Sequence, residues 1–284
     1  MRLPIAAALA FPIALAGQTT SSGAPAESGW IESRHAHYSV FYARGYEADA
    51  QRAAAWADSV ERTMRVKYGV TPRHYRFSIY LHATPTREAD VDNALVRCCS
   101  PAGGADSVGR IDMLTPSAPQ LRSASAVSSL GLAKASADYA AKVLSSEYIP
   151  IGHYEVQNAR AAGGWKYYDA PNWFVQGLQE YDAIFHSTVG NRTGTAKRLS
   201  AWAAAHQRAF TCCSPDLAIS DDYNGGAAFM MFLAHDFGEA VHAKILRSSA
   251  PTFADALTDA TRPYSRAELF SKLQQWLRDG APAT

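Results

Sequence analysis

Side chains capable of acid–base chemistry gather in one short stretch near the middle of the chain. Glu147 is followed by His153, Tyr154 and Glu155. A carboxyl group buried among aromatic rings has a raised pKa and can act as an acid or a base. A histidine beside a carboxylate can form a base with its orienting partner. These four residues are therefore the candidate catalytic residues. The alternative is a structural role, with Glu147 bonded to backbone or to a tyrosine.

The backbone around these residues is expected to be irregular. Pro150 and Gly152 lie between Glu147 and His153, and both residue types disturb a helix interior. His153 and Glu155 would point apart on a helix and together on a strand. The residues alone leave both arrangements open.

Residues 171–181 read Pro-Asn-Trp-Phe-Val-Gln-Gly-Leu-Gln-Glu-Tyr and predict a helix that begins at a proline. This segment resembles the Pro-x-Trp-hydrophobic-x-Glu-Gly-Leu-Ala-Glu-Tyr segment of zinc peptidases of the peptidase MA-like (gluzincin) family. Residues 223–229 resemble the later Tyr-x-x-Gly-x-x-Phe helix of the same family. The resemblance extends from about Trp30 to about Gly280 and implies a zincin-like fold.

The resemblance also indicates which residues occupy the metal positions. The family carries His-Glu-x-x-His on a helix, and the local match is Ser146-Glu147-Tyr148-Ile149-Pro150. It places Glu147 at the general-base position and Ser146 and Pro150 at the two histidine positions. Gln176 stands where the family has its third ligand, a glutamate. Serine is a poor zinc ligand, proline has no ligating side-chain atom, and glutamine carries no charge.

The sequence therefore predicts that the zinc triad is lost and that the protein has no cofactor. Glu180, one helical turn after Gln176, is expected to be a supporting carboxylate. An alternative keeps zinc, with His153, Glu180 and a histidine from elsewhere as unconventional ligands.

Aromatic residues surround the same stretch. Trp173, Tyr181 and Tyr148 are the candidate binding residues, because aromatic rings stack against sugars and aromatic ligands. Ordinary packing in the core and at its rim is the competing interpretation.

The N-terminus is typical of an exported protein. Arg2 precedes an apolar run, and Ala14-Leu15-Ala16 fits a small-x-small cleavage site. We therefore predict a signal peptide at residues 1–16, a flexible leader at residues 17–29, and a secreted or periplasmic protein. An uncleaved lipophilic anchor is the alternative.

Four cysteines occur as two adjacent pairs. Cys98-Cys99 and Cys212-Cys213 each belong to a Cys-Cys-Ser-Pro segment. An even number of cysteines in an exported protein indicates disulfides. Bridges between the two loops are favoured over bridges within a pair, which strain the peptide. A zinc site with four thiolates is the other possibility.

Composition excludes several function classes. The chain has 284 residues, 48% of them hydrophobic, and a formal net charge of +1. It carries no basic patch interleaved with aromatics, so we expect no nucleic-acid partner. No apolar stretch beyond the N-terminus is long enough for a transmembrane span.

Hydrophobic periodicity predicts the elements that hold these residues. Strands are expected at 37–42, 75–82 and 108–114, and helices at 46–68, 171–185, 195–209, 225–237, 239–247 and 266–278. Together they predict an α+β fold, with a small N-terminal mixed sheet and helices followed by a mainly helical C-terminal half. The resemblance implies that this fold is zincin-like. An α/β subdomain would span residues 30–122, and a helical subdomain carrying the degenerate motifs would span residues 123–284.

These observations favour an exported peptidase-like protein without the zinc triad. Its former catalytic cleft would bind a small molecule, a glycan, or a peptide ligand or partner. A metal-free acid–base enzyme using Glu147 and His153, and a zinc hydrolase with unconventional ligands, are the alternatives.

Overall fold

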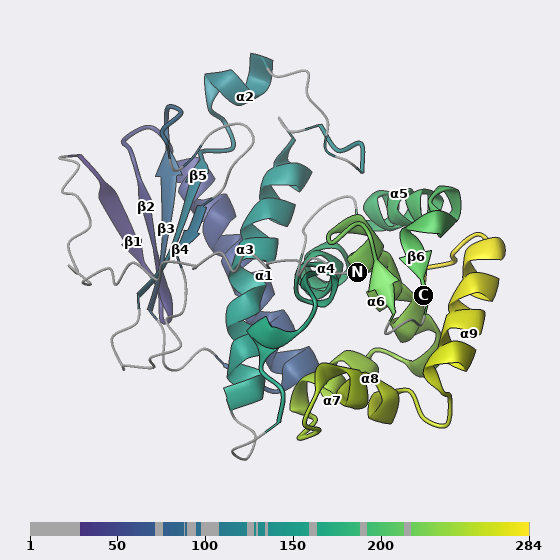
Figure 1. The fold of residues 1–284 in the computed structure, drawn as a ribbon. Coiled ribbons are helices and arrows are strands. Elements are labelled where there is room, and N and C mark those ends of the chain that lie inside the picture. Colours follow the sequence, from purple (N-terminus) through teal and green to yellow (C-terminus); the bar gives the residue numbers. More distant parts are fainter. Residues whose placement is uncertain are drawn as a thin grey trace, which may run out of the picture.

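The computed structural model describes residues 29–71, 76–87, 89, 95–97, 108–123, 128, 130–133, 136–158, 164–187, 192–212 and 217–283. Over these residues the chain is α+β, with a small mixed sheet followed by a mainly helical half (Figure 1). The predicted α+β class is therefore confirmed, and the likeness to zincins stays a prediction. The predicted signal peptide and almost all of the leader lie outside the described residues. Among the helices that are described, none combines the length and hydrophobicity that crossing a membrane requires.

The sheet has five strands in the order β1-β2-β3-β5-β4. They are β1 (Ile31–Arg34), β2 (Tyr38–Tyr42), β3 (Arg76–His82), β4 (Leu95–Arg97) and β5 (Val108–Leu114). The three central strands β2, β3 and β5 are parallel, and the two edge strands are antiparallel to their neighbours. Val40, Ile79 and Ile111 are paired across the central strands and are fully buried. This row of β-branched side chains explains why these strands lie at the centre.

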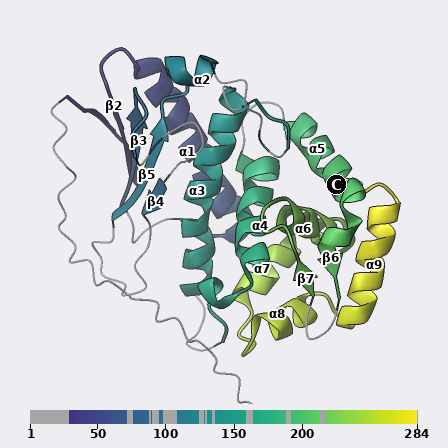
Figure 2. The ribbon, with the colours of Figure 1, turned by 45° about the horizontal axis from the view of Figure 1, so that its top comes forward.

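Two long helices, α1 (Glu47–Tyr68) and α3 (Ala137–Asn158), lie side by side against the sheet (Figures 1 and 2). Helix α1 buries an alanine-rich stripe and ends at Gly69, whose φ of 66° suits a left-handed cap. The two helices approach closely at Gly152, where an added Cβ would lie 2.5 Å from the Cγ atom of Met64.

The centre of the helical half is formed by α4 (Asn172–Asp182) and α6 (Asn224–Phe237). Their backbones touch at Gly177 and Gly226, because a Cβ on Gly226 would lie 2.1 Å from the carbonyl oxygen of Trp173. Gly177 belongs to the segment that resembles the zinc peptidases, and its lack of a side chain allows this close helix crossing. A π-helical turn, Ala183–Ser187, continues α4.

The remaining elements surround this pair. They are α2 (Pro119–Ser123), α5 (Arg192–Ala205), α7 (Ala240–Arg247), α8 (Phe253–Ala260), α9 (Arg266–Arg278), the 3-10 turns Tyr167–Asp169 and Gln207–Ala209, and the short strands β6 (Phe210–Thr211) and β7 (Ala218–Ile219).

Two large hydrophobic clusters fill the interior. One lies between the sheet and helices α1 and α3, and the other lies within the helical half. Both long helices contribute to both clusters, since Tyr68 of α1 and Val156 of α3 belong to the helical one. The subdomain boundary at residue 122 therefore stays a prediction.

Candidate functional site

Helix α3 carries the whole stretch from Ser146 to Glu155 and runs without a break through Pro150. The predicted irregularity of this helix is therefore wrong. On a regular helix Glu147 and His153, six residues apart, lie on different faces. The structure accordingly places them in two different polar environments.

The first environment, here called the acidic site, consists of Lys142, Glu147, Glu180 and Tyr223. Lys142 and Glu147 come from α3, Glu180 comes from α4, and Tyr223 precedes the first turn of α6. The Lys142 Nζ atom lies 2.5 Å from the Oε2 atom of Glu180, which is buried. Tyr223 is one of the most exposed large hydrophobic side chains of the described chain, at 54%.

Glu147 is half-buried within the acidic site, and none of the ion pairs among the described residues includes it. Within the described part of the chain, its carboxyl group has no hydrogen-bond partner. Burial, reinforced by the Glu180 carboxylate and opposed by the Lys142 ammonium, raises the pKa of Glu147 to about 7. The carboxyl group is thus about half protonated at neutral pH, when it can donate a hydrogen bond or a proton.

The positions that the resemblance assigns to metal ligands are Ser146, Pro150 and Gln176. Ser146 is buried and its hydroxyl group donates to the carbonyl oxygen of Val143, at 3.0 Å. Pro150 contributes no ligating atom, and Gln176 on α4 is neutral. Glu180 is held by Lys142. Among the described residues no three His, Cys, Asp or Glu side chains are grouped so as to hold a metal ion. The side chains at these positions are therefore not a donor set that zinc prefers.

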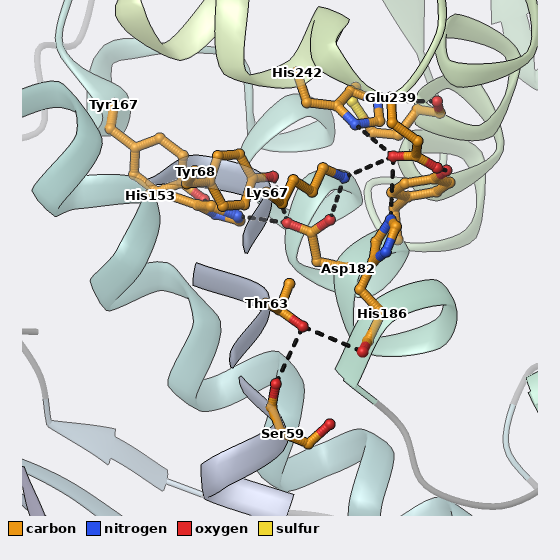
Figure 3. Close-up of polar contacts among 12 residues, drawn as sticks. Ser59, Thr63, Lys67, Tyr68, His153, Tyr167, Asp182, His186, Glu239 and His242 are labelled. Atoms are coloured by element: carbon orange, nitrogen blue, oxygen red, sulfur yellow. Dashed lines mark hydrogen bonds and ion pairs between the residues drawn. The ribbon is translucent and has the colours of Figure 1, made fainter. Parts of the chain in front are cut away.

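His153 belongs to the second environment, a network buried between α1, α3 and α4 (Figure 3). Its Nε2 atom lies 2.8 Å from the Oδ2 atom of Asp182, and its Nδ1 atom lies 2.9 Å from the hydroxyl oxygen of Tyr167. All three side chains are fully buried. Burial lowers the pKa of His153 despite the nearby Asp182 carboxylate, so the imidazole is neutral. An Nε2–H that donates to Asp182 and an Nδ1 that accepts from Tyr167 satisfy both partners.

Asp182 is the centre of this buried network. The Lys67 Nζ atom lies 2.6 Å from Oδ1, and the Tyr68 hydroxyl group donates to Oδ2 at 2.5 Å. Burial by itself would raise the pKa of Asp182, but the Lys67 ammonium and the His153 ring outweigh burial and hold it far below its ordinary value. Unlike Glu147, Asp182 is a fully compensated buried charge.

The network continues to the surface through Glu239, which precedes α7. Its carboxylate lies 3.1 Å from both Lys67 Nζ and His186 Nε2, and it accepts the hydroxyl group of Tyr181 at 2.5 Å. His242 lies beside it and is fully buried, with Nε2 donating to the carbonyl oxygen of Met230. Burial lowers the pKa of His242 to about 3. Figure 3 shows Lys67 between the Asp182 and Glu239 carboxylates.

The other candidate residues are distributed over the two cores. Tyr148 donates to Glu61 Oε1 at 2.8 Å, and Tyr154 packs beside the cluster under the sheet. Glu155 is half-buried on α3 and is not the partner of His153. Trp173 lies in the helical core, where its ring meets Phe229 and Phe253 edge-on. The structure therefore does not bring Glu147, His153, Tyr154 and Glu155 to one point.

Lys67, Tyr68 and Asp182 are polar residues that the sequence interpretation missed. Asp182 directly follows the peptidase-like segment and shares a helix face with Leu178, which gives it the spacing of a core residue. This spacing of a charged residue is the signal that could have identified it.

Of the predicted disulfide residues, Cys98, Cys99 and Cys213 lie outside the described residues. The Sγ atom of Cys212 lies 3.9 Å from the carbonyl oxygen of Arg266. The connectivity of the cysteines therefore stays a prediction.

Comparison with known proteins adds no assignment, because no family model and no curated protein matches the chain.

Proposed function

We propose that this chain is an exported peptidase-like protein without a zinc triad, which binds a hydroxyl-rich ligand such as an oligosaccharide at the acidic site. The observation that carries the proposal is Glu147, a half-buried carboxyl group without a hydrogen-bond partner in the described chain. Burial of a carboxyl group without a hydrogen-bond partner in the protein disfavours its ionised form. A bound ligand would supply the missing partner.

The charges of the acidic site favour a neutral ligand. The Glu180 carboxylate and the Lys142 ammonium form an ion pair, so they cancel. A protonated Glu147 adds no charge and offers one hydrogen-bond donor. Sugar hydroxyl groups can accept from Glu147, and the exposed ring of Tyr223 offers an apolar face for stacking. Peptides share the hydrogen-bonding capacity and are therefore the competing ligand class in the test.

The test uses the mature protein, residues 17–284, with arrays of neutral oligosaccharides and of peptides, followed by calorimetric titration of the best binder. Binding is expected to weaken as pH rises through about 7, because Glu147 loses its proton and becomes an anion beside Glu180. Glu147→Gln keeps a neutral donor, so its binding should not depend on pH in this range. Glu147→Ala should weaken binding about tenfold.

Asp259→Asn on α8, an exposed carboxylate paired with Arg262, is the matched control and should bind as the unmodified protein does. Selective binding of peptides would overturn the choice of ligand class. An oligosaccharide whose affinity is the same in Glu147→Ala would overturn the site.

Elemental analysis of the purified protein tests the missing zinc triad. We expect no stoichiometric zinc, because the side chains at the former ligand positions do not fit the metal. One zinc per chain would support a hydrolase with unconventional ligands.

A second candidate function is metal-free acid–base catalysis at the same site. It is favoured by the raised pKa of Glu147 next to a second carboxylate, Glu180. Glu180 would replace His153 as the second acid–base group beside Glu147. His153 is fully buried, and both of its ring nitrogens are hydrogen-bonded. Turnover of a bound oligosaccharide that disappears in Glu147→Gln, while binding persists, would support this candidate over simple binding.

A further inference from the structure

A cavity of about 250 Å³ lies where the start of α4 meets helices α8 and α9. Apolar side chains dominate its described lining, among them Trp173 from α4, Phe253 and Leu257 from α8, and Phe270 from α9. None of the four residues of the acidic site belongs to this described lining, so the cavity is a separate place on the molecule.

The volume of the cavity limits the size of its ligand. An apolar protein cavity of roughly 150 Å³ holds one benzene molecule, and sites for drug-sized molecules span roughly 300–1,000 Å³. A cavity of about 250 Å³ therefore has room for a molecule of one or two rings with few substituents.

The aromatic side chains of the described lining favour an aromatic ligand. The Trp173 and Phe253 rings meet edge-on, with centroids 5.6 Å apart and an interplanar angle of 74°, and Phe270 contributes a further ring. Aromatic rings attract one another in edge-to-face or offset arrangements. An aromatic ring inside the cavity therefore gains contacts that an aliphatic ligand of the same size lacks.

The polar groups of the described lining do not favour a charged ligand. The Thr252 hydroxyl group donates to Asp255 Oδ2 at 2.7 Å and accepts from the backbone N–H of Asp255 at 3.1 Å. Arg266 already interacts within the chain. Asp169 is exposed, so water solvates its carboxylate and an ion pair with a ligand there would contribute little. A neutral ligand brings no charge into the cavity that would need a partner.

We propose that this cavity binds a small, neutral aromatic molecule of one or two rings. The ring system would lie against Trp173, Phe253 and Phe270, and a single N–H or hydroxyl group would remain hydrated on the side of the exposed Asp169. Binding would be driven by the removal of apolar surface, on the ligand and on the cavity walls, from water. This site is independent of the proposed function of the acidic site.

Calorimetric titration of the protein with indole, a neutral two-ring molecule, tests the proposal. We expect one indole molecule to bind per chain. Indole should also raise the melting temperature, because a ligand that binds only the folded state stabilises it. No binding of indole or of benzyl alcohol at millimolar concentration would overturn the proposal.

Benzyl alcohol has analogues of nearly the same size that separate the effect of charge from the effect of the ring. Benzylamine is a cation and benzoate is an anion at neutral pH, so each should bind at least about tenfold more weakly than benzyl alcohol. Cyclohexylmethanol keeps the hydroxyl group without the aromatic ring, and it should bind about threefold to tenfold more weakly. Equal or tighter binding of a charged analogue would overturn the neutral class, and equal or tighter binding of cyclohexylmethanol would overturn the aromatic class.

Two variants locate the binding. Ala254 is a half-buried residue of the lining on α8, and Ala254→Trp should fill the cavity and abolish binding. Phe270→Leu keeps an apolar wall but removes a ring, so it should reduce the preference for benzyl alcohol over cyclohexylmethanol. Two matched controls lie outside the described lining, Ala267→Trp at an exposed position of α9 and Phe237→Leu at the half-buried end of α6. Both controls should bind these ligands as the unmodified protein does.

The melting temperature of each variant without ligand separates loss of binding from loss of the fold. Unchanged indole binding in a folded Ala254→Trp variant would place the ligand elsewhere and overturn the site. If Ala254→Trp does not fold, Phe270→Leu decides in its place. An unchanged ratio of the affinities for benzyl alcohol and cyclohexylmethanol in that variant would overturn the site.

Discussion

Asp182 and Glu147 are two carboxylates in separate polar environments next to helix α3. The charge of Asp182 is compensated by its neighbours, and the charge of Glu147 is not. Asp182 accepts from Lys67, Tyr68 and His153, and its pKa lies far below its ordinary value. Glu147 has no hydrogen-bond partner among the described residues and faces a second carboxylate, so its pKa rises to about 7. Burial acts on both groups, and the difference comes from their partners. Removing a partner of a compensated buried charge destabilises the fold, whereas an uncompensated charge itself costs stability and is a candidate for function.

The largest effect on the free energy of unfolding is expected from replacing Asp182, the carboxylate whose charge is compensated. Asp182→Asn leaves the Lys67 ammonium, which is only 7% exposed, with Glu239 as its remaining acidic partner. Removing one member of a buried ion pair costs about 3–5 kcal/mol. Guanidinium denaturation at pH 7 measures this loss. Asp259→Asn breaks an exposed ion pair and should cost about 0.5 kcal/mol or less. A loss below about 1 kcal/mol in Asp182→Asn would show that Asp182 is not the centre of the network.

Replacing Glu147, the carboxylate whose charge is not compensated, should raise the stability of the protein instead of lowering it. The pKa of Glu147 is higher in the folded state than the ordinary value of 4.5, so its contribution to stability is lost as pH rises from about 4.5 through about 7. The shift corresponds to about 3 kcal/mol above pH 7. Glu147→Gln should therefore stabilise the protein by up to about 3 kcal/mol at pH 8 and change little at pH 4.5. Urea denaturation at the two pH values measures this, and a destabilised variant at pH 8 would contradict the account.

His242, in the buried network, should make the stability depend on pH in the opposite direction to Glu147. Because burial lowers the pKa of His242 to about 3, its unfolded state binds more protons below pH 6.5. Stability is then present above pH 6.5 and falls on acidification, by about 2 kcal/mol at pH 5. His242→Gln should flatten the stability profile between pH 7 and pH 5 relative to the unmodified protein. If stability falls equally steeply between pH 7 and pH 5 in His242→Gln, a group other than His242 causes the acid sensitivity.

The smallest effect concerns the neighbours of Glu147. The Glu180 carboxylate raises the pKa of Glu147 and the Lys142 ammonium lowers it. Glu180→Gln should therefore lower the pKa of Glu147 by about one unit, and Lys142→Met should raise it. Carbon-13 NMR of the Glu147 carboxyl group follows both changes. Shifts of the same sign in the two variants would show that this neighbourhood does not control Glu147.

Periodicity in the sequence predicted helix α1 and the central strands well, because their apolar spacing extends over several turns or a whole strand. It did not predict helix α3, although this helix is as long as α1. The predicted strand at 108–114 and the helix at 266–278 match β5 and α9. The edge strands β1 and β4 and the short helix α8 were not predicted, because three to eight residues give little periodic signal. The prediction of an irregular backbone around Pro150 failed because packing of α3 between the sheet, α1 and α4 outweighs the local preference of proline.

Within the candidate site, the sequence identified Glu147 and Glu180 because each occupies a position in one of the two segments that resemble peptidase motifs. It did not identify Asp182 as a partner of His153, or Lys67 as a partner of Asp182. Lys67 and Asp182 are 115 positions apart in the sequence, so only the folded structure brings them together. Glu155 was the nearest carboxylate in the sequence, but a helical backbone directs the side chains of His153 and Glu155 apart.

The most direct test of the difference between Asp182 and Glu147 is the pKa of the Glu147 carboxyl group in the unliganded protein. It can be measured by carbon-13 NMR, with Glu147→Gln used to assign the resonance. The account predicts a pKa of about 7. A value near the ordinary 4.5 would mean that Glu147 is compensated after all, and it would contradict the assignment of the acidic site as the place where a ligand is needed.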